Sequence, residues 1–201
     1  ERLMRFGVAL LAGGQARRMG GAKAQRQLGD LTLLEHAIRR TKPWNAPMVL
    51  VLRSSSDVRS PGLRVIRDDP AIPGPLGGLA ADLADAEDAG LEAVLTVPCD
   101  MPFLPADLPD RLLPALQTGV SVAVAQSAVR RHPITALWRP EVAATLRDRA
   151  GRDQLSLRGL ADQAGSVAVS WSTEDGDPFF NINTPGDLEQ AARWYEGRAS
   201  V

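Results

Sequence analysis

The chain alternates short apolar runs with longer amphipathic stretches, and this alternation restricts the fold more than any other feature of the sequence. Several apolar runs are β-branched at consecutive positions, as in strands that are buried on both faces. These strand candidates are FGVALL, MVLVL, LRVI, AVLTVP, VSVAVA and VAVSW. The helix candidates between and after them are LLEHAIRR, GGLAADLADAEDAG, PADLPDRLLPALQ, EVAATLRDRA, LSLRGLADQAG and PGDLEQAARWYEGR. Such alternation predicts an α/β fold of three layers (α/β/α), in which helices cover both faces of a mainly parallel sheet.

Length and charge set limits on the function. A chain of 201 residues suffices for one domain with a sizeable core, and 44% apolar residues is an ordinary share. We therefore expect one domain over residues 1–201. The net charge of −1 argues against nucleic-acid binding by bulk electrostatics. No apolar run approaches the roughly 20 residues of a membrane span, and we expect no membrane partner.

Two further features bear on location. The start, ERLMRFGVALLAGG, resembles a signal peptide, but its apolar part runs directly into a basic loop, so a strand and a turn explain it better. Cys99 is the single cysteine, so the chain forms no internal disulfide. Both features fit a cytoplasmic location, and the position of Cys99 behind an apolar run predicts a thiol in the core.

A glycine-rich, basic loop, LAGGQARRMGGAK at residues 11–23, follows the first apolar run. Glycines let backbone N–H groups approach a phosphate closely, and cations offset the charge of the phosphates. The residues concerned are Gly13, Gly14, Gly20, Gly21, Arg17, Arg18 and Lys23. The spacing matches neither a Walker loop nor GxGxxG. The alternatives are a triphosphate site and a tight turn with solvated arginines.

Asp100 follows the apolar run AVLTVPC, which predicts a carboxylate at the tip of a strand, facing the glycine loop. A carboxylate at that place can hold Mg²⁺ against phosphate oxygens. The alternative is a turn or N-cap aspartate within CDMP.

Asp68 and Asp69 precede the loop AIPGPLGGL. Either carboxylate could accept hydrogen bonds from a base or a ribose hydroxyl. Both could equally begin a turn, as Asp-Asp-Pro often does.

The segment FFNINTP carries Asn181 and Asn183 at alternate positions, so an extended backbone directs both side chains to the same side. Their uncharged amides suit a phosphate, and the alternative is a cap for the helix that begins at Pro185. His132 is interpreted as a packing or substrate-side residue, because an ionised phosphate nucleophile needs no general base.

The loop pattern L-A-G-G-x-A-x-R-M-G-x-x-K resembles the signature of nucleotidyltransferases with a Rossmann-like fold of the nucleotide-diphospho-sugar transferase type. Within this group it looks most like the molybdenum cofactor guanylyltransferases. Three further stretches resemble the same family in the same order: GPLGGL at 74–79, VPCDMP at 97–102 and FFNINTPGDL at 179–188. Together the four motifs cover the chain from Leu11 to Leu188.

The resemblance implies transfer of GMP from GTP to the terminal phosphate of molybdopterin, with release of pyrophosphate and formation of molybdopterin guanine dinucleotide. It implies a nucleotide-binding half at about 1–110 and a pterin half at about 111–201, with Mg²⁺ on Asp100 and partner proteins that deliver the cofactor. The implied catalytic residues are Arg18, Lys23 and Asp100. The implied nucleotide contacts are Leu11, Ala12, Gly13, Gly14, Lys23, Asp68, Gly74, Pro75, Leu76 and Asp100, and the implied pterin contacts are Asn181 and Asn183. Distance from Gly74 favours Asp68 over Asp69.

The chain departs from the family pattern at a few positions. Ala22 stands where aspartate commonly precedes the loop lysine, and Gln25, Arg26 and Gln27 replace the usual leucines and proline. Arg53 or Ser54 stands where an asparagine typically contacts nucleotide, so no asparagine is carried over. These departures keep two alternatives open: a cytidylyltransferase that uses CTP and the same pterin, and a non-catalytic relative that binds nucleotide or cofactor.

Overall fold

A seven-stranded sheet, in the order β5-β4-β1-β6-β8-β7-β9, forms the centre of the computed structural model, which describes residues 4–12, 23–53, 58, 62–128 and 130–199. The strands are β1 Phe6–Leu11, β4 Met48–Leu52, β5 Arg64–Arg67, β6 Ala93–Pro98, β7 Val122–Ser127, β8 Arg130–Trp138 and β9 Ser166–Trp171. The helices are α1 Leu33–Thr41, α2 Pro75–Asp88, α3 Leu108–Leu112, α4 Val142–Gly151, α5 Leu157–Ala164 and α6 Pro185–Ala199. Short elements complete the fold: the hairpin β2 Gln27–Leu28 and β3 Leu31–Thr32, and the 3-10 turns η2 Lys23–Gln25, η3 Lys42–Trp44 and η4 Leu113–Ala115.

The predicted mainly parallel sheet is confirmed. Strand β1 pairs parallel with β4 and β6, β4 with β5, and β7 with β9. Strand β8 is antiparallel to both of its neighbours, β6 and β7. All six apolar runs form strands, whereas β8 was not among the strand candidates.

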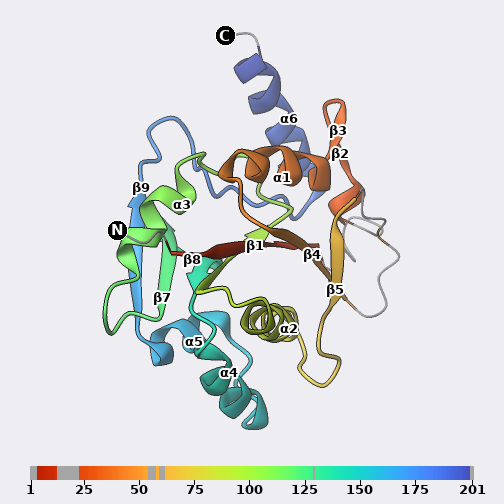
Figure 1. The fold of residues 1–201 in the computed structure, drawn as a ribbon. Helices are drawn as coiled ribbons and strands as arrows, with labels where there is room; N and C mark the ends of the chain where they lie inside the picture. Colours follow the sequence, from red (N-terminus) through yellow and green to blue (C-terminus); the bar gives the residue numbers. More distant parts are fainter. Residues whose placement is uncertain (1–3, 13–22, 54–57, 59–61, 129, 200–201) are drawn as a thin grey trace.

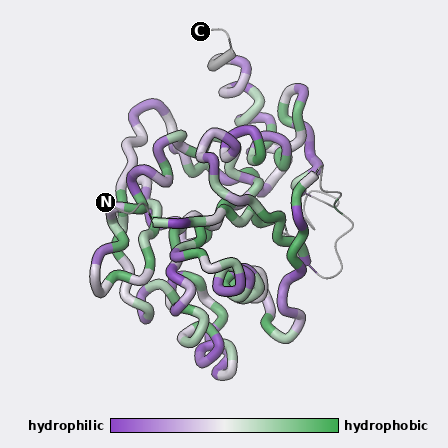
Figure 2. Tube along the Cα trace, viewed as in Figure 1, coloured by the Kyte–Doolittle hydropathy of each residue, from purple (hydrophilic) through white to green (hydrophobic). Residues whose placement is uncertain are grey.

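The three predicted layers are also confirmed. Helices α1, α3 and α6 lie on one side of the sheet, and α2, α4 and α5 lie on the other (Figure 1). The strands of the centre are hydrophobic and the outer helices carry the hydrophilic stretches (Figure 2). Along β1 the side chains alternate, because Val8 and Leu10 belong to one buried cluster and Ala9 to another. Both faces of β1 are therefore covered, which explains its continuous apolar sequence.

The two predicted halves contribute adjacent parts of one sheet. Strands β5, β4, β1 and β6 come from the nucleotide half, and β8, β7 and β9 come from the other half. They meet where β6 pairs with β8. The assignment of the halves to nucleotide and pterin stays a prediction.

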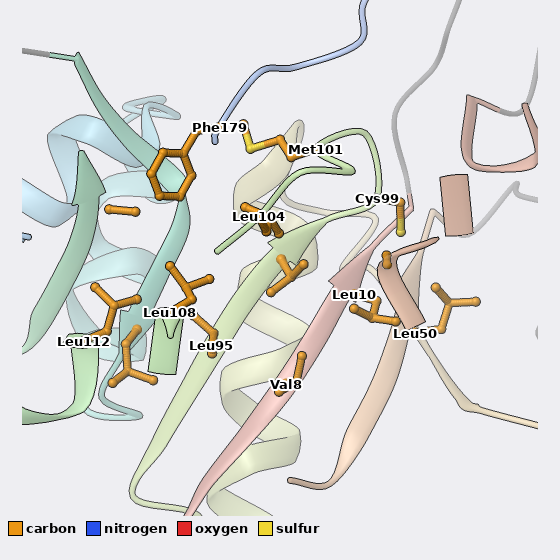
Figure 3. Close-up of a cluster of buried hydrophobic side chains, with 14 of the residues drawn as sticks. Val8, Leu10, Leu50, Leu95, Cys99, Met101, Leu104, Leu108, Leu112 and Phe179 are labelled. Atoms are coloured by element: carbon orange, nitrogen blue, oxygen red, sulfur yellow. The ribbon is translucent and has the colours of Figure 1, made fainter. Parts of the chain in front are cut away.

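The main buried cluster continues up to the edge of the sheet at which β1 and β6 end. Figure 3 shows Val8, Leu10 and Leu95 along the strands, with Cys99 and Met101 beyond their ends. This packing supports the loop that follows β6. No helix in the described part of the chain is long and apolar enough to cross a membrane.

Candidate active site

The site begins at the carboxyl edge of the sheet, where β1 and β6 end side by side. Every residue of β6 is buried, and the Cys99 backbone N–H then donates to the Leu11 carbonyl at 3.1 Å. Asp100 is the first charged residue after the strand, and its side chain is 20% exposed. The backbone pairing thus places this carboxylate at the start of the glycine loop, as predicted.

Lys23 reaches this carboxylate from η2. Ala24, the next residue, is only 3% exposed and packs in the main core. The Lys23 Nζ atom lies 2.6 Å from Asp100 Oδ2. It also donates to Asn183 Oδ1 at 2.8 Å and to Asn181 Oδ1 at 3.3 Å. One ammonium group therefore joins three of the four motifs that the sequence singled out.

The two asparagines are held by a backbone contact to Asp100. The Ile182 N–H donates to the Asp100 carbonyl at 3.0 Å, and the Ile182 side chain is fully buried. Asn181 and Asn183, on either side of it, therefore point away from the core and toward Lys23. The prediction that both asparagines face the same way is confirmed by their shared contact with the Lys23 ammonium. Their role toward a pterin stays a prediction.

Asp100 retains a free acceptor. Its Oδ1 atom is buried and has no hydrogen-bond partner among the described residues. A buried carboxylate oxygen without a partner is costly unless something binds to it, and a cation is the natural ligand. The described residues contain no group of three or more His, Cys, Asp or Glu side chains placed to hold a metal. A site with one carboxylate fits Mg²⁺, which usually binds through one or two carboxylates plus substrate phosphates and water.

A cavity of about 290 Å³ extends from Asp100 along the edge of the sheet. Its lining includes Leu11, Pro98 and Asp100 near β1 and β6, and Arg53, Asp68, Gly74 and Pro75 beyond β4 and β5. Ala12 borders a much smaller cavity of about 20 Å³ together with Lys23 and Asp100. Leu76 is fully buried in a hydrophobic cluster and does not line the larger cavity.

The two neighbouring aspartates have different surroundings. Asp68 lines the cavity. The Asp69 Oδ1 atom accepts a hydrogen bond from the Ala71 N–H at 2.9 Å, which is the turn geometry expected of Asp-Asp-Pro. This difference agrees with the preference for Asp68, whose contact to nucleotide stays a prediction.

The GPLGGL motif shapes the far end of the cavity. Gly74 is the N-cap of α2 and has φ of 73°, a conformation that favours glycine. A Cβ atom on Gly77 would collide with the Ile72 carbonyl and would lie 2.9 Å from the Asp69 carbonyl. Gly77 therefore lets the 69–72 turn lie directly on the first turn of α2, next to Asp68.

Several residues of the predicted phosphate loop lie outside the described residues: Gly13, Gly14, Gly20, Gly21, Arg17 and Arg18. Their roles as phosphate contacts stay predictions. The described ends of the loop, Leu11 and Lys23, are nevertheless both at the site, since each borders a cavity that Asp100 also lines.

Ile134 lines the cavity and was not anticipated. The register between β7 and β8 shifts at this place: Val124 pairs with Ala136, but Ala125 pairs with His132. Residues 133–135 of β8 have no pairing partner on β7 and form a bulge. A bulge can direct a side chain such as that of Ile134 toward the cavity, and it accommodates Pro133, which has no backbone N–H to donate. The signal in the sequence was Pro133 within an otherwise strand-like run.

His132 and Cys99 belong to the core. His132 is 4% exposed, lies 2.7 Å from Ser127 Oγ through its Nε2 atom, and stacks on Phe179. Burial lowers the pKa of His132, so the neutral imidazole is favoured. Burial, and after it the nearby Asp100 charge, raises the pKa of the Cys99 thiol. These environments agree with the interpretation of both residues as packing residues.

A parallel sheet with a lysine–carboxylate pair and a cavity at its carboxyl edge is the arrangement of a nucleotide-binding α/β protein. Residues 8–168 match the family model of the MobA-like NTP transferase domain, and the chain belongs to this family. It is an enzyme of the nucleotidyltransferase class.

One curated relative supports this assignment, and two solved structures share the fold. The molybdenum cofactor guanylyltransferase of Sinorhizobium fredii (strain NBRC 101917 / NGR234) is 39% identical over 197 residues, which cover 93% of this chain and 90% of the relative. The crystal structure of molybdopterin-guanine dinucleotide biosynthesis protein A from Archaeoglobus fulgidus has a TM-score of 0.75 at 22% identity, covering 95% of this chain and 99% of that one. A 2-C-methyl-D-erythritol 4-phosphate cytidylyltransferase from Thermus thermophilus shares the fold, with a TM-score of 0.67 at 21% identity over 96% of this chain and 100% of that one.

Proposed function

We propose that this enzyme transfers GMP from GTP to the terminal phosphate of molybdopterin, releasing pyrophosphate and forming molybdopterin guanine dinucleotide. The relative from Sinorhizobium fredii, named as a molybdenum cofactor guanylyltransferase, matches over nearly the whole chain. The single structural observation that carries the proposal is the contact of Lys23 with Asp100, the carboxylate that lines one end of the 290 Å³ cavity. A cation and a free carboxylate oxygen are thus side by side where the phosphates would lie.

The chemistry needs positioning and charge more than proton transfer. The terminal phosphate oxygen of molybdopterin is already ionised, so it attacks the α-phosphate of GTP without a general base. This agrees with the burial of His132 in the core. The Lys23 ammonium stabilises the negative charge that grows on the departing pyrophosphate. We propose that Arg18 assists from the loop.

We propose that the Asp100 carboxylate would hold Mg²⁺ through its free Oδ1 atom. The bound ion would supply charge neutralisation between phosphate oxygens. The ion on Asp100 and the charge of Lys23 would then act on the triphosphate together, because the two side chains already lie 2.6 Å apart.

The far end of the cavity suits a guanine base. The base offers N7 and O6 as acceptors, and N1–H and the N2 amino group as donors. Asp68 can accept from the donor side, Arg53 can donate to the acceptor side, and the backbone at Gly74 and Pro75 borders the same space. A base with the wrong pattern leaves polar groups unpaired, at about 1–3 kcal/mol each.

The remaining partners follow from the reaction. We propose that molybdopterin binds on the side of Asn181 and Asn183, which lie beside Lys23. A cytoplasmic location fits the use of GTP and the single free cysteine, which is buried. Delivery proteins would receive the finished cofactor.

The test is pyrophosphate release from GTP, CTP, ATP and UTP, each with and without molybdopterin. We expect release with GTP and molybdopterin together. Release with CTP in place of GTP would instead identify a cytidylyltransferase. Binding of GTP without molybdopterin-dependent release would identify a non-catalytic relative.

A further inference from the structure

Asn181 and Asn183 have their side-chain oxygens directed at Lys23, and this orientation has a consequence for catalysis. We infer that the two asparagines are positioning residues for the Lys23 ammonium, and that the same contacts turn their amide nitrogens toward the acceptor phosphate. This inference rests on the proposed function, in which the positive charge of Lys23 stabilises the triphosphate. The inference goes beyond the proposed function in two respects. It names Asn181 and Asn183 as the residues that hold Lys23, and it names their amide nitrogens as the atoms that contact the phosphate of molybdopterin.

The direction of each amide follows from the chemistry of the lysine. An ammonium group has three donors and no acceptor, so only the carbonyl oxygen of an amide can face it. Its three contacts are Asp100 Oδ2 at 2.6 Å, Asn183 Oδ1 at 2.8 Å and Asn181 Oδ1 at 3.3 Å. These contacts match the three donors, and the Lys23 side chain is only 12% exposed. The ammonium is therefore held in one place before any substrate binds.

The amide nitrogens are the remaining polar atoms of the two asparagines. Neither Nδ2 atom donates a hydrogen bond to a described residue. With both oxygens fixed on Lys23, the two NH₂ groups offer neighbouring donors beside a cation. A phosphate oxygen is the acceptor that such an arrangement suits, since hydrogen bonds to an anion are the stronger ones.

The start of α6 keeps the two asparagines rigid. The Asp187 Oδ2 atom accepts from the backbone N–H groups of Asn183 and Thr184, both at 2.8 Å, while the Asp187 N–H donates to Thr184 Oγ1 at 3.1 Å. This reciprocal cap fixes the backbone of Asn183. The buried Ile182, bonded to the Asp100 carbonyl, fixes the residue between the two asparagines. The position of Lys23 is thus set by a segment about 160 residues away in sequence.

Two nearly isosteric substitutions of Asn183 separate the two roles. Asn183→Leu removes both the oxygen and the NH₂ group, whereas Asn183→Asp keeps the oxygen and removes the donors. The chain has only two lysines, Lys23 and the exposed Lys42, so ¹⁵N-lysine labelling gives an ammonium NMR signal for each. We expect a protected Lys23 signal, identified by its loss in Lys23→Met, and fast exchange at Lys42.

The expected results differ between the variants. Hydrogen exchange at Lys23 rises about tenfold in Asn183→Leu, the effect of one lost hydrogen bond to a charged group, and stays slow in Asn183→Asp. Both variants raise the KM for molybdopterin about tenfold or more in the pyrophosphate assay, while Asn45→Asp, at the end of η3, leaves it unchanged. Asn183→Ala provides the same comparison if the leucine variant does not fold.

Each part can be overturned separately. Unchanged exchange at Lys23 in Asn183→Leu would overturn the positioning role. An unchanged KM for molybdopterin in Asn183→Asp would overturn the assignment of the amide nitrogens. Failure of the wild-type enzyme to release pyrophosphate would count against the proposed function only, because the exchange measurement needs no substrate.

Discussion

Two aspartates of this enzyme, Asp100 and Asp82, each have a buried side-chain oxygen without a hydrogen-bond partner among the described residues. The surroundings of the two carboxyl groups differ. Asp100 Oδ1 lies at the carboxyl edge of the sheet, next to the Lys23 ammonium. Asp82 Oδ2 lies on α2, in a residue that is 3% exposed. An unpaired carboxyl oxygen therefore occurs once at the cavity proposed to bind GTP and once at a smaller cavity, of about 130 Å³, that Asp82 lines.

The surroundings of Asp82 favour the neutral acid. The nearby Arg64 is already engaged, since its Nη1 and Nη2 atoms bind Asp85 at 2.5 and 2.6 Å. Burial raises the pKa of Asp82 to about 8, and the Asp85 charge adds to this effect. A protonated carboxyl needs no counter-ion.

Asp100 has a cation on one oxygen and a cavity beside it. A carboxylate with one unpaired oxygen indicates a metal or phosphate site when its other oxygen is paired with a cation at the edge of a cavity. Asp82 also lines a cavity, of about 130 Å³, but the Arg64 guanidinium there is paired with Asp85, so the buried Asp82 carboxyl is expected to take up a proton. The comparison predicts that substitution by asparagine abolishes most of the activity at Asp100 and leaves the activity unchanged at Asp82.

The largest expected effect is the loss of activity in Asp100→Asn. The substitution keeps the shape but removes the charge that pairs with Lys23 and would hold Mg²⁺. We expect kcat/KM for pyrophosphate release to fall on the order of 10³-fold, the scale of losing a main electrostatic contact.

Asp82→Asn is the matched control for that experiment. It makes the same chemical change far from Lys23, and we expect kcat/KM to stay near the wild-type value. Comparable losses in the two variants would contradict the distinction between the two sites.

A smaller effect is expected on stability, and it depends on pH. The folded pKa of Asp82, about 8, lies above its ordinary value of 3.8, so the unfolded chain binds fewer protons between these values. The contribution of Asp82 is complete below about pH 4 and is lost as pH rises toward 8, at up to about 1.4 kcal/mol per pH unit.

Urea denaturation of wild type and Asp82→Asn at pH 5, 6, 7 and 8 measures this contribution. The stability of the variant relative to wild type is expected to increase with pH, because asparagine does not ionise. A constant difference across this range would show that Asp82 is not protonated in the folded protein.

The layers and the central strands could be predicted because β1, β4, β6 and β7 are buried at most of their positions and leave a clear apolar signature. The edge strands β5 and β9 are more exposed and were predicted from their short apolar runs alone. Strand β8 could not, because Arg130, Arg131 and Pro133 obscure it and its bulge is a property of pairing with β7. Pro133 is compatible with a bulge, but the position of the bulge depends on the register with the partner strand.

The candidate site also has parts that the sequence predicts and parts that it does not. The motifs indicated that Lys23 and Asp100 lie at one edge, since both follow strands that end there. The contact of Lys23 with Asn181 and Asn183 spans 158 and 160 residues, and the same asparagines could equally have capped α6. Only the folded chain decides between those alternatives. The interior position of Asp82 was likewise hidden, because DLADAEDAG has the composition of a solvated helix face.

The most direct test of the central claim is a crystal structure with a non-hydrolysable GTP analogue and Mn²⁺, whose anomalous signal locates the ion. We expect the ion on Asp100 Oδ1, the phosphates beside Lys23, and the guanine between Arg53 and Asp68. An ion elsewhere, or a nucleotide outside the cavity that Asp100 lines, would contradict the proposed site.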